Sequence, residues 1–206
     1  MPNAYGKTKD FTVVGGAQYS YDFDNFLFMP SSLTAGVEYS YNKLNDLMLG
    51  YHREINQEVF VYSAYLQNEW KTGRFSFLLG GRLDKNSEID DPIFSPRLNI
   101  RYNPIPDLSL RASYSEGFRA PQTYDEDLHV AVVGGEVTLI QVAKDLKTER
   151  SRSYSASVDY YTTWGPVQIN LLLEGFYTSL HNPFVLEEIE SDDENKILER
   201  RNGSDA

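Results

Sequence analysis

Apolar and polar side chains alternate along eight separate stretches of the chain, and each stretch predicts a β-strand with one apolar face. In "FVYSAYLQNEW", Phe60, Tyr62 and Leu66 share one side, while Val61 and Ser63 lie on the other. The alternating stretches, most of them about ten residues long as barrel strands are, are 12–21, 33–41, 60–70, 74–84, 97–102, 108–115, 153–160 and 167–177. We therefore expect an all-β, antiparallel protein.

The links between these stretches alternate between short and long. The links at 71–73, 103–107 and 163–166 are short, and Gly or Pro sets their backbone angles. Long links follow at 43–58, 85–95, 118–148 and from 181 onward, and a link of middle length, 22–32, takes the place of a short one. Short turns at one end and long loops at the other are typical of a transmembrane β-barrel of the outer membrane.

The aromatic residues agree with a membrane barrel. Trp70 and Trp164 both lie beside short turns, where an aromatic girdle forms at a membrane interface. The opposite face of the strands is polar and would line the barrel lumen; it carries Arg82, Arg97, Arg101, Arg111, Glu69, Asp159 and Glu174. In the stretch 60–70, Asn68 is out of place on the apolar face.

Two other architectures also fit the alternation. A soluble β-sandwich would bury the apolar face between two sheets and expose the polar face to water. A small barrel closed by these eight strands alone would have its lumen filled by side chains and a structural or adhesive role.

Composition excludes several functions. The 206 residues carry a net charge of −11, which disfavours nucleic-acid binding because phosphate contacts need Lys and Arg. The chain has no cysteine, so it has neither disulfides nor thiolate metal sites. It has no apolar run long enough for a transmembrane helix and no secretory signal at its start, so we expect a mature chain or a piece of a longer one.

The stretch "YSEGFRAP" at 114–121 resembles the strand-end motif of TonB-dependent outer-membrane receptors. In that family a long outer loop follows, and then a motif like Leu-Lys-Pro-Glu opens the next strand. Here "LKTERSRSYS" begins at Leu146, with Thr148 where the proline is usual. The strand pairs in 68–84 and 94–115 are also similar to hairpins of that family, and the resemblance covers about residues 11–181.

The resemblance implies a barrel of about 22 strands with a plug domain in its lumen. Residues 1–206 would be a single region, eight strands of that barrel without the plug. The intact protein would lie in the bacterial outer membrane, contacting lipid and lipopolysaccharide, and would not be an enzyme. It would bind a small scarce nutrient, such as an iron–siderophore, haem or cobalamin complex, and import it through the TonB complex acting on the plug. No resident cofactor is expected.

The strand-end motif consists of Gly117, Phe118, Arg119, Ala120 and Pro121. We expect Gly117 to let the chain bend and Pro121 to end strand pairing, because proline has no N–H. Phe118 would anchor at the interface, and Arg119 would pair with the acidic residues that follow. The candidate ligand contacts are Arg119, Tyr124 and His129 in the outer loop.

Three histidines, His52, His129 and His181, fall in long links and are weak candidates for a metal or haem site. His129 follows the strand-end motif, as a functional histidine does in some haem receptors of the family. The acidic runs 125–127 and 187–194 predict solvated loop surface, with loose calcium binding as the alternative. The chain contains none of the common hydrolase or phosphate-loop motifs.

Overall fold

The computed structural model describes residues 6–48, 53–121, 132–133, 136–191 and 195–206. These residues form strands joined by turns, and no helix among them is long and apolar enough to cross a membrane. In chain order the strands are β1 (Gly6–Phe26), β2 (Met29–Met48), β3 (Arg53–Lys71), β4 (Phe75–Asn86), β5 (Ile93–Ile105), β6 (Leu108–Arg119), β7 (Val132–Val133), β8 (Glu136–Val142), β9 (Glu149–Trp164), β10 (Val167–His181), β11 (Phe184–Ser191) and β12 (Asn195–Asn202).

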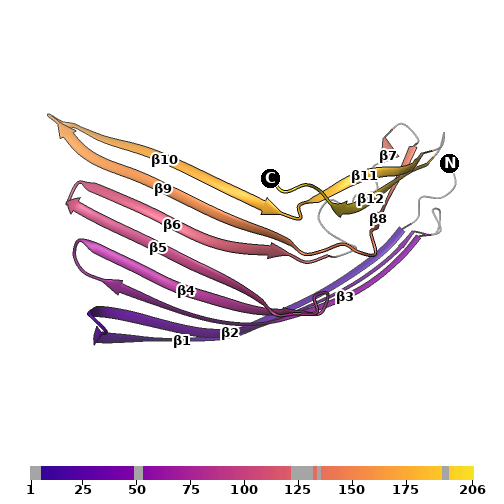
Figure 1. The fold of residues 1–206 in the computed structure, drawn as a ribbon, viewed down its shortest axis with the longest axis horizontal. Coiled ribbons are helices and arrows are strands. Elements are labelled where there is room, and N and C mark those ends of the chain that lie inside the picture. Colours follow the sequence, from indigo (N-terminus) through magenta and orange to yellow (C-terminus); the bar gives the residue numbers. More distant parts are fainter. Residues whose placement is uncertain (1–5, 49–52, 122–131, 134–135, 192–194) are drawn as a thin grey trace.

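Eight strands form one curved antiparallel sheet in the order β1-β2-β3-β4-β5-β6-β9-β10 (Figure 1). These are the eight strands that the alternation predicts, so the all-β fold class is confirmed. β1 and β10 stand at the two ends of the sheet and do not pair with each other. The alternative of a small barrel closed by these eight strands is therefore wrong.

The first three strands are about twice as long as predicted. β1, β2 and β3 have 21, 20 and 19 residues. Most of the predicted long link at 43–58 is therefore strand, and the link at 22–32 shrinks to a turn at Leu27 and Phe28. The link at 103–107 also shortens to Pro106 and Asp107, because β5 continues to Ile105.

The two faces of the main sheet differ as the alternation predicts. Apolar side chains such as Val37, Leu66 and Leu173 lie on the convex face and are 59%, 55% and 74% exposed. No second sheet covers them within the described residues, so the β-sandwich alternative is wrong as well. A face of this kind suits contact with lipid.

Trp70 organises the short-turn end of β3. Its indole N–H donates to the carbonyl oxygen of Phe26, 2.9 Å away. Its ring stacks on Phe26 and Phe28, with centroids 6.3 and 5.5 Å apart, and only 6% of the residue is exposed. Trp164 lies beside the turn at Gly165, whose φ is +61°, and is 81% exposed. Both tryptophans thus lie at the end where we expect a girdle.

A second sheet of four strands, in the order β11-β12-β8-β7, lies beyond the long-link end of the main sheet (Figure 1). β8 comes from the link between β6 and β9, whereas β11 and β12 follow β10, and β12 pairs with β8 in parallel. The expectation that residues 118–148 and the residues after 181 are plain loops is therefore wrong. Backbone hydrogen bonds between β8 and β12 thus join two segments that lie far apart in the sequence.

Candidate functional site

The concave face of the main sheet holds an arginine network across three strands. Register pairing places Glu38 on β2 opposite Ser63 on β3, and Ser63 opposite Asp84 on β4. Arg82, two residues before Asp84, lies on the same face. Neighbouring polar positions on one face of a sheet are close enough for their side chains to interact.

Arg82 binds all three of these side chains. Its Nε donates to Asp84 Oδ1 at 2.8 Å, and its Nη2 donates to Glu38 Oε1 at 2.8 Å and to Ser63 Oγ at 2.7 Å. The Ser63 hydroxyl donates in turn to Asp84 Oδ1 at 2.5 Å. The Asp84 side chain is only 5% exposed, whereas that of Arg82 is 38% exposed. Arginine therefore compensates a carboxylate that is almost buried.

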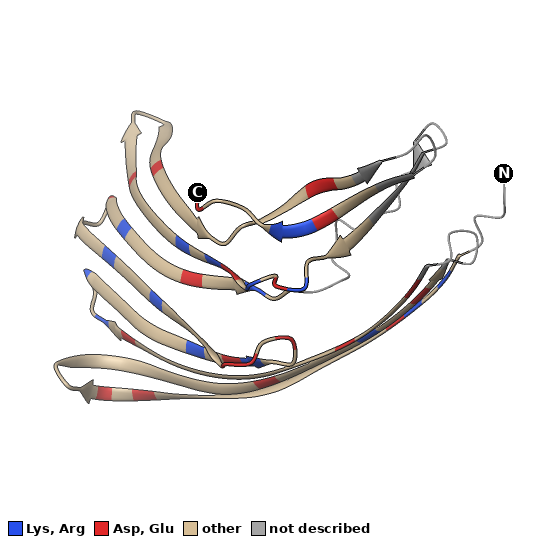
Figure 2. Ribbon diagram, turned by 45° about the vertical axis from the view of Figure 1, so that its right-hand side comes forward, with Lys and Arg blue, Asp and Glu red and all other residues tan. Residues whose placement is uncertain are grey.

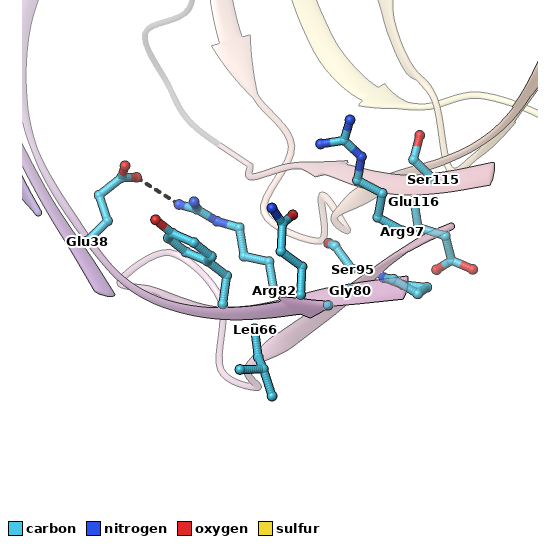
Figure 3. Close-up of a pocket in the computed structure, with 12 residues that line it drawn as sticks. Glu38, Leu66, Gly80, Arg82, Ser95, Arg97, Ser115 and Glu116 are labelled. Atoms are coloured by element: carbon cyan, nitrogen blue, oxygen red, sulfur yellow. Dashed lines mark hydrogen bonds and ion pairs between the residues drawn. The ribbon is translucent and has the colours of Figure 1, made fainter. Parts of the chain in front are cut away.

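A cavity of about 420 Å³ lies beside this network (Figure 3). The side chains that line it from the concave side include Tyr65, Gln67, Arg82, Ser95, Arg97 and Ser115. Figure 3 shows Leu66 pointing away, to the opposite side of the sheet from Arg82 and Arg97. The lining side chains on the concave side thus all carry hydrogen-bonding groups, which suits a polar ligand.

Tyr65 sets one edge of the cavity. Its hydroxyl donates to Gln18 Oε1 at 2.9 Å, which holds the ring across β2. A Cβ atom at Gly36, its register partner, would lie only 2.3 Å from the tyrosine ring. A glycine is therefore required where the ring crosses the neighbouring strand.

Basic side chains continue along the concave face next to the cavity. Arg97 and Arg101 alternate with Asn99 on β5, and Arg111 lies directly opposite Arg101 on β6. Within the described residues, the acidic neighbour of Arg111 is Asp159 at 3.9 Å, which also accepts the Asn170 amide at 2.7 Å. Figure 2 shows the basic bands on the middle strands of the sheet. This part of the wall suits a ligand with anionic oxygens.

The strand-end motif closes β6. Gly117, Phe118 and Arg119 pair in register with Ser151, Arg150 and Glu149 on β9, and Ala120 is buried just after the strand. Gly117 therefore stays in regular pairing, and pairing stops before Pro121. The roles proposed for these five residues stay predictions.

Arg119 contacts the second sheet. Its guanidinium lies over the Phe184 ring, 5.3 Å from the centroid. Phe184, the first residue of β11, also donates its N–H to Glu149 Oε2 at 2.6 Å. Arg119 and its register partner Glu149 thus both hold the start of β11, which is a structural contact that the sequence did not suggest.

Tyr124, His52 and His129 lie outside the described residues, so the ligand and haem roles predicted for them stay predictions. His181 is the last residue of β10, and its Nδ1 lies 2.7 Å from Asp205 Oδ2. The Asn182 N–H, 3.0 Å from Asp205 Oδ1, together with His181, lowers the pKa of the Asp205 carboxyl. In the part of the chain that the structure describes, no group of three potential metal ligands comes together.

The acidic runs are only partly described. Residues 125–127 and 192–194 fall outside the described residues. Glu187, Glu188 and Glu190 belong to β11, so the expectation that they lie in a loop is wrong. Glu187 Oε2 is 2.9 Å from the Arg201 guanidinium on the neighbouring strand β12, which compensates its charge.

Sequence patterns and solved structures place the chain among known proteins. The sequence pattern of a family described as TonB dependent receptor-like, beta-barrel matches residues 2–194. The chain belongs to this family. TonB-dependent receptor barrels lie in the bacterial outer membrane, so the apolar convex face is the lipid-facing wall and the concave face lines the lumen.

One relative of this TonB-dependent receptor barrel is the iron-regulated outer membrane virulence protein of Vibrio cholerae serotype O1. The two sequences are 29% identical over 157 residues, which is 74% of this chain and 22% of the relative.

Solved structures have the same fold. The siderophore receptor PirA of Pseudomonas aeruginosa superimposes with a TM-score of 0.73 at 18% identity, covering 98% of this chain and 38% of that one. A mutant of the ferric enterobactin receptor PfeA of the same organism, in complex with enterobactin, gives a TM-score of 0.70 at 17% identity and covers 98% of this chain and 32% of that one. The chain therefore spans between about a fifth and two fifths of the length of these relatives.

Proposed function

We propose that these residues are part of the wall of a receptor that takes up an iron–siderophore complex across the outer membrane with energy from TonB. The concave cavity beside Arg82 and Arg97 carries the proposal, because it places a cationic, hydrogen-bonding surface inside the barrel. The end with the second sheet would face the cell exterior, and the short turns would face the periplasm. The cargo would be an anionic chelate, whose oxygens arginine binds well.

Several observations support this cargo class over haem or cobalamin. Two similar structures are of siderophore receptors, and the V. cholerae relative is named for its regulation by iron. Arg97 is exposed in the cavity and forms no ion pair with another described residue, so its charge is open to a ligand. The receptor would act as a transporter and not as an enzyme, and would hold no resident cofactor.

The test is uptake of radiolabelled iron by cells that carry the intact receptor as their sole route for a given ferric siderophore. Uptake should require TonB, and Arg97→Glu should weaken siderophore binding about tenfold because it replaces an attractive charge by a repulsive one. Arg74→Glu, an exposed change at the short turn after β3, is the matched control and should bind normally.

Two outcomes would contradict the proposal. Uptake that does not require TonB would contradict the proposed energy coupling. Equal siderophore binding by wild type, Arg97→Glu and Arg74→Glu would show that the ligand does not contact this cavity.

A further inference from the structure

The end of β12 carries a chemically labile pair of residues, Asn202 and Gly203. Asn202 is the only asparagine in the chain that a glycine follows. A backbone nitrogen can attack the side-chain amide carbon of the asparagine before it. This attack is fastest from glycine, because glycine has no Cβ to hinder the approach and lets the chain bend freely. Of all the asparagines in the sequence, Asn202 is therefore the one most prone to lose its amide.

The fold of the second sheet requires both residues. The Asn202 Nδ2 donates to the carbonyl oxygens of Lys147 and Asn182 at 3.0 and 2.9 Å, and its Oδ1 accepts the Lys147 N–H at 2.8 Å. Only an amide can donate and accept in this way, and a carboxylate can only accept. A Cβ atom at Gly203 would lie 2.8 Å from Val185 Cγ1 on β11, which forces one of them to move. A more stable pair of residues would therefore lose either these hydrogen bonds or this fit.

The same contacts block the attack while the second sheet is folded. The attacking nitrogen is that of Gly203, and its N–H donates to the Pro183 carbonyl oxygen at 2.7 Å. Asn202 pairs in register with Phe184 and belongs to β12, so its backbone is extended. Ring closure needs the nitrogen of the next residue to turn toward the side chain. The reaction therefore requires the end of β12 to separate from the start of β11.

We propose that Asn202 is a site of spontaneous deamidation that becomes reactive only when this end of the second sheet opens. In the open state the deprotonated Gly203 nitrogen attacks Cγ of Asn202, and the bond from Cγ to Nδ2 breaks. Ammonia leaves, and a five-membered succinimide ring remains. Water then adds to one of the two ring carbonyls and opens the ring to aspartate or isoaspartate. The reaction consumes one water, releases one ammonia and needs no oxidant or cofactor.

The modification would prevent the opened end from closing again. A carboxylate at position 202 has no N–H to donate, so its charged oxygens would face the carbonyl oxygens of Lys147 and Asn182. Isoaspartate would in addition lengthen the backbone by one atom and disturb the register of β12 with β11. A transient opening of the second sheet is thus converted into a permanent one, and the charge at position 202 records that it occurred.

The experiment follows position 202 in the intact receptor, purified in detergent and kept at mildly alkaline pH, which favours loss of the backbone proton. Peptide mapping by mass spectrometry measures the fraction of Asn202 converted over time. The folded receptor should convert at least about tenfold more slowly than the same receptor unfolded in guanidinium chloride, because only the open state reacts. In the unfolded receptor Asn202 should convert faster than Asn86, which Ser87 follows.

Two variants test where the opening occurs and what it causes. Phe184→Ala removes the ring that lies under the Arg119 guanidinium at the start of β11 and leaves the labile pair unchanged, so the folded variant should convert several-fold faster. Gln141→Ala, an exposed change on β8, is the control and should convert at the wild-type rate. Asn202→Asp builds the product directly and should raise hydrogen exchange in 197–202 several-fold.

Equal conversion of folded and unfolded wild-type receptor would overturn the proposal, as would conversion of Asn202 no faster than that of Asn86 in the unfolded receptor. An unchanged rate in folded Phe184→Ala would overturn the opening at β11. Unchanged hydrogen exchange in Asn202→Asp would overturn the effect on the second sheet. If Phe184→Ala fails to fold, the wild-type comparison still decides. None of these measurements involves iron uptake, so the result is independent of the proposed transport function.

Discussion

At the scale of single residues, Asn68 is the side chain that fits its surroundings least. It lies on the lipid-facing side of β3, between its register partners Leu33 and Leu79, and is only 6% exposed. Neither its amide nitrogen nor its amide oxygen has a hydrogen-bond partner in the described part of the chain. A buried polar group without a partner costs about 1–3 kcal/mol.

Asn68→Leu should therefore stabilise the intact receptor by about 1 kcal/mol, because leucine has the same forked shape and lacks the unpaired amide. The midpoint of denaturant unfolding in detergent would measure it. Asn170→Leu is the matched change and should destabilise, since the Asn170 amide donates to Asp159. A lower midpoint for Asn68→Leu would show that its amide has a partner in the intact protein.

Replacing Arg82 should have the opposite effect and lower the stability of the barrel. Arg82→Met should destabilise the barrel by about 1–3 kcal/mol, since it leaves Asp84 almost buried without its cation. The same unfolding midpoint measures the change, and Arg74→Met at the exposed turn is the control. If Arg82→Met/Asp84→Leu recovers most of the lost stability, the cost comes from the unpaired carboxylate. No recovery would point to the packing of the Arg82 stem.

The sequence predicted which side of the sheet each of these residues occupies, but not what each contacts. Alternation alone places Glu38, Ser63 and Arg82 on polar faces, because the side-chain period of a strand is two. Their contacts depend on how far each strand is shifted against the next, and alternation contains no information on that shift. The Arg82 network and the contact of Arg119 with Phe184 therefore required the structure.

At the scale of elements, alternation predicted the eight strands but not their lengths. In the outer parts of β2 and β3 the pattern inverts: Leu44, Ile55 and Val59 are buried on the concave side, at 3%, 8% and 6% exposure. A strand that has left the lipid meets water on its outer face, so its apolar residues turn inward. Residues 43–58 therefore lack the pattern of a membrane strand, and their sequence alone predicts a long link.

The Asn202 side chain connects the second sheet to the segments that lead into β9 and out of β10. Its Nδ2 donates to the carbonyl oxygens of Lys147 and Asn182 at 3.0 and 2.9 Å, and the Lys147 N–H donates to its Oδ1 at 2.8 Å. One side chain thus joins the end of β12 to the chain before β9 and to the turn after β10.

Asn202→Ala should loosen the second sheet while the main sheet stays intact, because three hydrogen bonds are lost at one point. Hydrogen exchange of the intact receptor should rise several-fold in 136–142 and 197–202 and stay constant in β5 and β6. Gln141→Ala, an exposed change on β8, is the control. Unchanged exchange in Asn202→Ala would show that strand pairing alone holds the sheet.

At the scale of the whole molecule, the main sheet has two edge strands, β1 and β10. Unpaired strand edges are not tolerated in lipid, because backbone groups there have no water to bond. In the intact receptor further strands would pair with these edges.

The 206 residues expressed alone should therefore fail to form a membrane barrel. They should aggregate after refolding into detergent and run at one position in gels with or without heating, whereas the intact receptor should shift on heating. A heat-dependent shift for the isolated residues would show that β1 and β10 can close on each other.

The length of β1–β3 predicts how antibodies would recognise the part of these strands that extends beyond the membrane. A strand of 20 residues is roughly 65 Å long, whereas the apolar band of a barrel is only about 25 Å tall, so these strands form a stiff paired ridge outside the membrane. Antibodies raised against linear peptides from 43–48 or 53–58 should bind whole cells poorly, because paired strands present those residues in one fixed shape. Antibodies raised against the folded receptor should bind this ridge, which would make it a conformational epitope.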